Sequence, residues 1–439
     1  MFGAGKPWRA YSWLGQVLFA LVEKDFGLRG LISLELCTIF LFLLASVWSL
    51  ASTSRSLLLG FLLTLLSAVG CYWHISLRPQ TLTWILYPVV ILLCERVRAR
   101  GLSVGYGAKL AGILCLWANI HVSTVIPLAT IALLVEREKA GRVAMLLFTC
   151  FVATLLTPNF GTEWISAMNY VGHPATFTLI SELRPVTFLD PWSVPLLIGA
   201  ALLLWLCHSM PRALSLRVLA GWFVLLCLSL AVMRFIPFAV MLTCGLIAQI
   251  LGEQKGAREA VLRLTEKRVV RQALVVVILV ITGVSIKVAH LRLVQAWDRV
   301  IDSNFVARGA VDFIESRSLP KPILNSFEDG HYLMYRYADQ NGEPGYRVPI
   351  DGRTEVNTKE AWDEFKASYL GAERWQDFID LVKAKTIIWP TGSPFVRILT
   401  ASGQWCLVYQ DGPVTGTSVL VQRSVWEERR AHLDSVNCY

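Results

Sequence analysis

Apolar and polar stretches divide the chain into ten long apolar segments and a polar C-terminal stretch. The apolar segments lie at roughly 28–50, 57–76, 81–95, 104–118, 121–135, 143–158, 191–208, 216–233, 235–251 and 272–293. Apolar runs of this length are typical of helices that cross a membrane. The predicted fold class is a polytopic α-helical membrane protein of about ten segments with a C-terminal soluble α/β domain.

The apolar run from Leu110 to Val135 decides the orientation of every later segment. One helix over this run would be about 39 Å long, against a hydrocarbon core of about 30 Å, and Asn119 and His121 would lie at its centre. Basic residues, which mark the cytoplasmic side, flank the run on both sides. They are Arg96, Arg98, Arg100 and Lys109 upstream and Arg137, Lys139 and Arg142 downstream. We therefore predict a hairpin over 104–135.

The loops beyond the hairpin agree with this turn. The basic stretch 252–272 then lies inside, whereas the loop 159–190, with Glu163, Glu182 and Asp190 against Arg184, lies outside. The predicted organisation is an outer interfacial segment at 1–27, a transmembrane domain at 28–293 and an extracytoplasmic α/β domain at 294–439. Both ends of the chain are predicted to be outside.

The C-terminal stretch alternates two periodicities. β-like runs lie at 323–325, 346–350, 386–389, 405–409 and 418–421. Helical periodicity marks 307–317, 359–370, 374–384 and 395–401. This stretch is long enough to form its own core.

Composition supports the membrane class and removes nucleic acid as a partner. The chain is 55% hydrophobic and 17% charged, whereas soluble proteins carry about 25% charged residues. Its net charge of +9 comes from basic residues in short loops, as topology requires. Of the ten cysteines only Cys406 and Cys438 lie in the polar stretch, and no spacing predicts a metal site.

Unusual polar residues are predicted to gather at the outer ends of the segments, where ionisable groups are functional candidates. They are Arg78, Gln80, Asn119, His121, Asn159, Glu182, Arg184, Asp190 and Arg234. Arginine, carboxylate, amide and imidazole on one face could grip a phosphate and activate a hydroxyl. Each has a plainer interpretation: anchoring arginines, groups that satisfy a turn, or loop carboxylates. His74 is interpreted as interfacial rather than as a ligand, and Asp351-Gly352-Arg353 first as a turn.

Several short motifs occur in a characteristic order along nearly the whole chain. They are Gly5-Lys6-Pro7-Trp8, Tyr11-Ser12-Trp13-Leu14-Gly15-Gln16, Arg78-Pro79-Gln80, Trp117 to His121, Pro158-Asn159-Phe160-Gly161, Arg234-Phe235-Ile236-Pro237 and Asp351-Gly352-Arg353. Together they resemble a family of bacterial polytopic membrane proteins in the GT-C glycosyltransferase-like group. That group distantly includes protein mannosyltransferases, aminoarabinose transferases and oligosaccharyltransferases.

The resemblance implies transfer of a sugar from a polyprenyl-phosphate donor at the outer face of the bacterial inner membrane. In such enzymes a carboxylate serves as base or metal ligand, and arginines hold the lipid phosphate. Among the residues present, this assigns catalysis to Glu182 and Asp190 and lipid phosphate to Arg78, Arg184 and Arg234. Substrate contacts fall to Gln80, Asn119, His121, Asn159, Asp351 and Arg353. The cofactor is left open, although this chemistry is compatible with a divalent cation, and the protein or glycan acceptor is left open as well.

Relatives carry a further helix and an Asp-rich stretch before the Gly-Lys-Pro-Trp segment, so we expect that Met1 is not the natural start. The tail matches the family's Trp-Gly-Gly-Tyr-like pattern only in part, at 326–332. The alternative function is a non-catalytic membrane protein whose exported α/β domain binds a polysaccharide or an assembly partner. A transporter ranks third, because no segment carries paired charges or broken-helix repeats.

Overall fold

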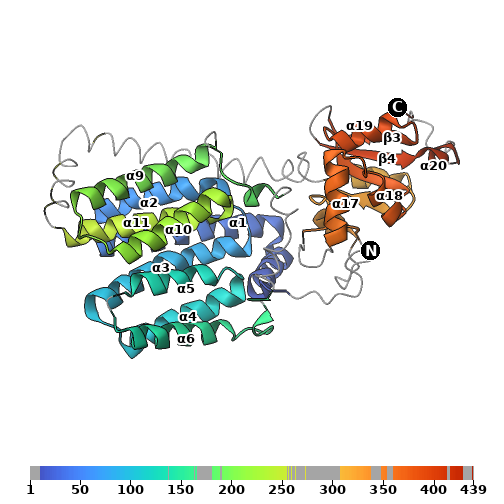
Figure 1. Ribbon diagram of the computed structural model, residues 1–439. Helices are drawn as coiled ribbons and strands as arrows, with labels where there is room; N and C mark the ends of the chain where they lie inside the picture. Colours follow the sequence, from blue (N-terminus) through green and yellow to red (C-terminus); the bar gives the residue numbers. More distant parts are fainter. Residues whose placement is uncertain are drawn as a thin grey trace. The chain divides into compact units, whose positions relative to one another are not determined.

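The computed structural model describes residues 10–136, 138–162, 164–165, 180–187, 190–254, 307–337, 348–352, 359–412, 416–428 and 438, with four isolated positions between 255 and 306. The described residues fall into two compact units, one helical and one formed by the C-terminal part of the chain (Figure 1). Each unit is described by itself.

The helical unit is built from long apolar helices that follow the predicted segments closely. They are α1 (Trp13–Ser54), α2 (Leu57–Cys71), α3 (Pro79–Arg100), α4 (Val104–Ile120), α5 (Val125–Leu134), α6 (Ala140–Thr154), α9 (Val194–Ser209), α10 (Leu216–Ala231) and α11 (Ile236–Glu253). Short 3-10 turns lie at η1 (Tyr72–His74), η2 (Ser181–Leu183), η3 (Pro191–Ser193) and η4 (Met233–Phe235). The predicted segment 272–293 lies outside the described residues, Gln272 excepted.

Three of these helices are long and apolar enough to cross a membrane by length and composition: Arg29–Ser54, Leu57–His74 and Met233–Glu253. Five other apolar helices, α4, α5, α6, α9 and α10, are only 10–17 residues long. The described residues are thus mostly helical, as predicted, but length and composition mark fewer spans than the ten segments of the sequence pattern.

The chain turns back between α4 and α5, as predicted. At one end, Asn119 Nδ2 of α4 donates to Leu156 O, just after α6 (3.0 Å). At the other end, the Leu102 N–H donates to Glu138 Oε1, so the starts of α4 and α6 also meet (2.5 Å). Helices α4 and α6 therefore run in the same direction, and α5, which connects them, must run the opposite way.

Helix α11 is the centre of the helical unit. Every residue from Ile236 to Gly252 is buried, and α11 contacts α1, α2, α3, α9 and α10. Glycines permit the closest approaches: a Cβ on Gly245 would lie 2.9 Å from Ile91 Cγ2, and one on Gly252 would collide with Thr53 O. Trp222 Nε1 of α10 donates to Thr243 Oγ1 of α11, which satisfies both polar groups inside the core (2.8 Å).

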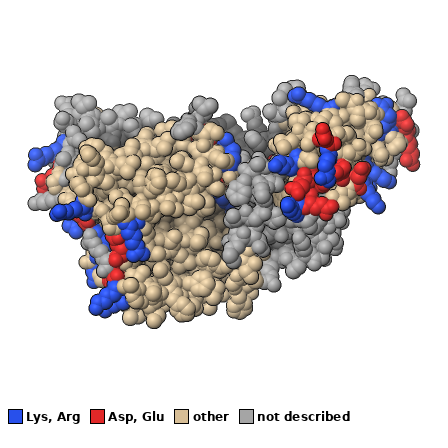
Figure 2. Space-filling model, viewed as in Figure 1, with Lys and Arg blue, Asp and Glu red and all other residues tan. Residues whose placement is uncertain are grey.

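The surrounding helices carry apolar side chains on their outer faces. Phe40, Phe148, Trp205 and Phe223 are each more than half exposed. Figure 2 shows a broad face of the helical unit without charge, with its charged residues gathered mainly toward one end. A helix of a water-soluble bundle would carry polar residues on that face.

The C-terminal unit contains a four-stranded sheet in the order β1-β2-β4-β3, flanked by helices. Strands β1 (Ile323–Asn325) and β2 (Thr386–Pro390) are parallel; β4 (Thr417–Gln422) is antiparallel to both β2 and β3 (Trp405–Gln410). The helices are α15 (Arg308–Ser316), α16 (Gly330–Arg336), α17 (Lys359–Leu370), α18 (Asp377–Val382), α19 (Pro394–Ala401) and α20 (Arg423–Glu428). Cys406 and Cys438 form a disulfide bond, with Cα atoms 4.6 Å apart.

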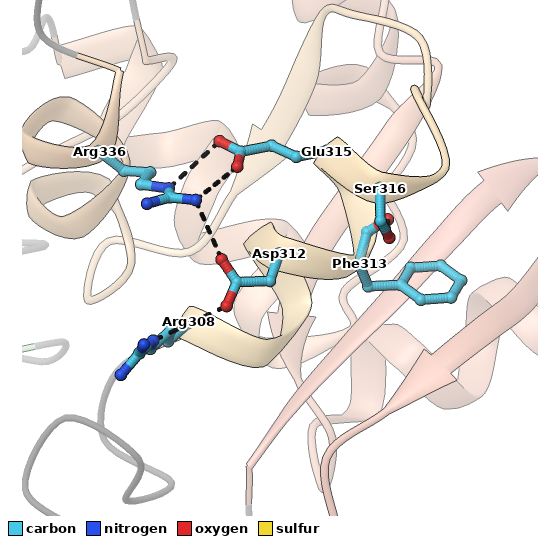
Figure 3. Close-up of polar contacts among 6 residues, drawn as sticks. All are labelled: Arg308, Asp312, Phe313, Glu315, Ser316 and Arg336. Atoms are coloured by element: carbon cyan, nitrogen blue, oxygen red, sulfur yellow. Dashed lines mark hydrogen bonds and ion pairs between the residues drawn. The ribbon is translucent and has the colours of Figure 1, made fainter. Parts of the chain in front are cut away.

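An exposed ion cluster joins α15 to α16 (Figure 3). Arg336 reaches both carboxylate oxygens of Glu315, at 3.2 and 2.6 Å, and Asp312 at 3.1 Å. Arg308 lies 3.7 Å from the other oxygen of Asp312. Because these side chains are well exposed, the cluster orients α16 rather than supplying much stability.

The tight glycine contacts of α1 generate a stability prediction. Gly60→Ala and Gly252→Ala should each lower the thermal unfolding temperature, because the added Cβ would collide with backbone atoms of Ala51 and Thr53. Overpacking of this kind costs about 1–3 kcal/mol. The matched control is Gly112→Ala on α4, where no atom lies within 4 Å and the helix should gain about 0.5–1 kcal/mol. Equal unfolding temperatures in all three variants would contradict the packing.

Candidate functional site

Polar residues from several segments meet at one end of the helical unit. Trp13 Nε1 donates to Asn119 Oδ1 at 2.7 Å, and Asn119 Nδ2 donates to Leu156 O. Asn159 Nδ2 donates to Ala10 O at 3.3 Å. The start of α1 therefore lies against the ends of α4 and α6, before the helix is interrupted at Gly27, where φ is +61°.

The same end also brings α1 to the start of α3, where the predicted arginine motif lies. A Cβ on Gly15 would lie 3.0 Å from Pro79 Cβ, so the glycine makes room for the close approach of the two segments. Arg78 is the N-cap residue of α3, with Pro79 at its first position, and Arg234 lies in η4 just before α11. Both arginines thus stand at the N-termini of long helices.

A pocket opens between these two helix starts. Its walls come from η1, the first turns of α3, η2 and the start of α11: His74, Ser76, Arg78, Gln80, Thr81, Trp84, Glu182, Arg234 and Pro237. Helices α3 and α11 both begin beside the pocket, and the N-terminus of a helix carries a partial positive charge. Two guanidinium groups add full charges. The pocket is therefore suited to an anion.

The polar groups of the pocket are linked in two pairs. Arg78 forms an ion pair with Glu182 through Nη1 and Oε1, with 50% and 28% of their side chains exposed. Arg234 Nε donates to Gln80 Oε1 at 2.8 Å. Within the described part of the chain, the terminal nitrogens of Arg234 and the second terminal nitrogen of Arg78 have no hydrogen-bond partner. They remain able to bind an acceptor.

A backbone connection holds Glu182 beside the pocket. The Met233 N–H donates to Arg184 O at 3.2 Å, and the Val186 N–H donates to Leu230 O at 2.8 Å. The loop that carries Glu182 is thereby fixed against the segment that carries Arg234.

Asp190 and Arg184 form a separate arrangement outside the pocket lining. Arg184 Nη2 donates to Asp190 Oδ1 at 2.9 Å, while the N–H and hydroxyl of Thr187 donate to Oδ2 at 2.8 and 2.9 Å. The Thr187 backbone hydrogen bond, followed by its hydroxyl and Arg184, lowers the pKa of the Asp190 carboxyl. These contacts organise the turn before α9, so Glu182 is the better placed carboxylate for chemistry.

The other predicted substrate residues have mixed positions. Asn119 is engaged by Trp13, Cys115 O and Leu156 O, and His121 Nδ1 lies 2.8 Å from Ser123 Oγ. His121 thus bonds within the turn between α4 and α5, in agreement with its plainer interpretation, whereas Asn119 links α4 to the start of α1 and to the end of α6.

Asp351 is buried in the C-terminal unit. A Cβ on Gly330 would collide with Ile350 O, and one on Gly352 would collide with the His331 ring. These two glycines thus bring 330–331 and 350–352 together. Arg353 lies outside the described residues.

Sequence reasoning did not select His74, Ser76, Thr81, Trp84 or Pro237, which also line the pocket. Trp84 follows Gln80 by four residues and therefore lies on the same face of α3, a spacing that could have found it. His74 was interpreted as interfacial.

Comparison with known proteins does not extend this assignment. No protein-family model and no curated protein matches the chain. Among the described residues, no three His, Cys, Asp or Glu side chains form a group that could hold a metal ion.

Thermal unfolding can distinguish the structural role of Asp190 from that of Glu182. Asp190→Asn should lower the thermal unfolding temperature at pH 7, because three hydrogen bonds to a carboxylate are lost or weakened. The folded-state pKa is below its ordinary value of 3.8, so the stabilisation is present above that pH and is lost as the pH falls through the folded-state pKa. The difference in unfolding temperature between wild type and Asp190→Asn should therefore become smaller at acid pH.

The control is Glu182→Gln, whose ion pair is half exposed and should contribute little to stability. If Glu182→Gln destabilised the protein as much as Asp190→Asn does, the distinction between a structural carboxylate and one in a partly exposed ion pair would be wrong.

Proposed function

We propose that the chain is a multi-pass protein of the bacterial inner membrane and that its pocket lies at the outer face. The exposed apolar faces of the helical unit support the membrane proposal. The disulfide between Cys406 and Cys438 supports an extracytoplasmic C-terminal unit, because such bonds persist in oxidising compartments. On the side of the helical unit opposite the pocket, the end of α3 carries Arg96 and Arg100 and the start of α6 carries Lys139 and Arg142. This is in keeping with a cytoplasmic side.

The proposed activity is that of a GT-C-like glycosyltransferase, which transfers a sugar from a polyprenyl-phosphate donor. The observation that carries it is the pocket, which Arg78 and Arg234, at the starts of α3 and α11, line together with the carboxylate of Glu182. An anion site beside a carboxylate, at the edge of an apolar bundle, suits a donor with a lipid tail and a charged head. The resemblance of the motifs to that group points to the same chemistry.

In the proposed reaction, Glu182 takes the proton of an acceptor hydroxyl, whose oxygen attacks the anomeric carbon of the sugar. The bond between that carbon and the phosphate oxygen breaks, and the polyprenyl phosphate leaves with the electron pair. Its phosphate changes from a singly charged diester to a doubly charged monoester. Arg78 and Arg234 therefore interact more strongly with the leaving group than with the donor, which lowers the barrier.

The orientation is tested by thiol labelling with a membrane-impermeant maleimide. In a variant whose free cysteines are replaced and whose Cys406–Cys438 pair is kept, Ser402→Cys should react in cells with a permeabilised outer membrane. Lys139→Cys, at the opposite side, should react only after the inner membrane is broken. Both positions are exposed, so accessibility of the side chain is matched. The reverse pattern would refute the topology.

The phosphate site is tested by Arg78→Lys and Arg234→Lys. Lysine keeps the charge but loses the paired donors of a guanidinium, so each variant should bind a polyprenyl phosphate about 1.5–3 kcal/mol more weakly. Sugar transfer in proteoliposomes should fall with it. Arg217→Lys is the control, because Arg217 Nη2 donates to Ala132 O at the opposite end of the bundle, away from the pocket. If both pocket variants bound like wild type, the arginines would be membrane anchors. Binding without transfer would favour the non-catalytic alternative.

A further inference from the structure

Two residues that line the pocket each carry a buried ring nitrogen without a hydrogen-bond partner among the described residues. These nitrogens are His74 Nε2 and Trp84 Nε1. Trp84 is 3% exposed, so water at the surface of the protein does not satisfy its N–H. Buried donors are almost always paired, and leaving one unpaired costs free energy. Two of them in the wall of one pocket need an explanation.

The chemistry of the pocket supplies one. The indole N–H can only donate, and the terminal nitrogens of Arg234 are likewise donors without a partner in the described part of the chain. The acceptors that line the pocket include Glu182, which Arg78 engages, and the Gln80 oxygen, which Arg234 Nε engages. A ligand with acceptor oxygens could pair with these donors.

We propose that His74 and Trp84 are two further ligand-binding residues of the pocket, whose neutral ring N–H groups hydrogen-bond to oxygens of the bound phosphate. The inference rests on the proposed function, which places a lipid-linked phosphate between Arg78 and Arg234. His74 donates from the tautomer that is protonated on Nε2. The arginines supply positive charge. The two neutral ring N–H groups orient the phosphate through directional hydrogen bonds, and they are less costly to desolvate than a charged group.

The proposal depends on the position of His74 and Trp84 in the pocket lining, and not only on their buried, unpaired nitrogens. Trp362 and Trp389 in the C-terminal unit also have buried Nε1 atoms without a partner among the described residues, and neither lines this pocket. Trp389→Phe is therefore a matched control: it removes the same kind of N–H from a site that should not contact the ligand.

The test measures binding of geranyl phosphate to the full chain in lipid nanodiscs. Trp84→Phe and His74→Phe should each weaken binding about three- to tenfold, the effect of losing one neutral hydrogen bond. His74→Gln should bind nearly like wild type, because its amide nitrogen can replace Nε2. Trp389→Phe should not change the affinity. The same order of variants with inorganic phosphate would support contact with the phosphate group itself.

A second readout separates a ligand contact from a structural role. Without ligand, Trp84→Phe should unfold at a temperature no lower than wild type, since it removes an unpaired buried donor. Loss of stability with unchanged affinity would overturn the proposal. If both Phe variants bound like wild type while Arg78→Lys lost affinity, the inference would fail and the phosphate site would stand. If Arg78→Lys and Arg234→Lys also bound like wild type, the phosphate site itself would fail.

Discussion

The burial of α11 is the constraint on which the rest of the helical unit depends. A helix that is apolar on all sides must be surrounded, and five other helices contact it. Once α11 is enclosed, the residues just before it are fixed as well. Arg234 therefore enters the pocket from a rigid support, although it lies in a short 3-10 turn. A side chain held this way loses less conformational entropy on binding than one on a free loop.

The pocket depends equally on the start of α3. Pro79 fixes the first turn of that helix and leaves Arg78 extended as its N-cap, with φ −131° and ψ 151°. Gln80 and Trp84 then project from one face, and Gln80 accepts a hydrogen bond from Arg234. Two helices far apart in sequence thus share one polar contact at their N-termini. That contact brings two guanidinium groups to one pocket despite their mutual repulsion.

The sequence predicted the elements better than it predicted their contacts. Periodicity located α17 at 359–370 and β2 from residue 386, because local pattern and local structure coincide there. It failed at 346–350, whose described part, 348–350, is not a strand. There Ile350 O accepts a hydrogen bond from the side chain of Asn325 in β1, not from the backbone of a paired strand. Charge bias predicted the gathering of Arg78, Glu182 and Arg234. It could not predict the hydrogen bonds that Thr187 donates to Asp190, since they depend on the conformation of one turn.

The two ends of the helical unit differ in how their polar side chains are paired. Away from the pocket, Arg98 is almost fully buried, and its charge is matched by Glu95 and Glu253. Glu138 accepts from the Leu102 N–H, and Glu136 accepts from Ser215, so carboxylates there have donors. At the pocket end, by contrast, the terminal nitrogens of Arg234 and the buried ring nitrogens of His74 and Trp84 have no hydrogen-bond partner among the described residues. This contrast supports the proposal that a bound ligand accepts hydrogen bonds from these nitrogens.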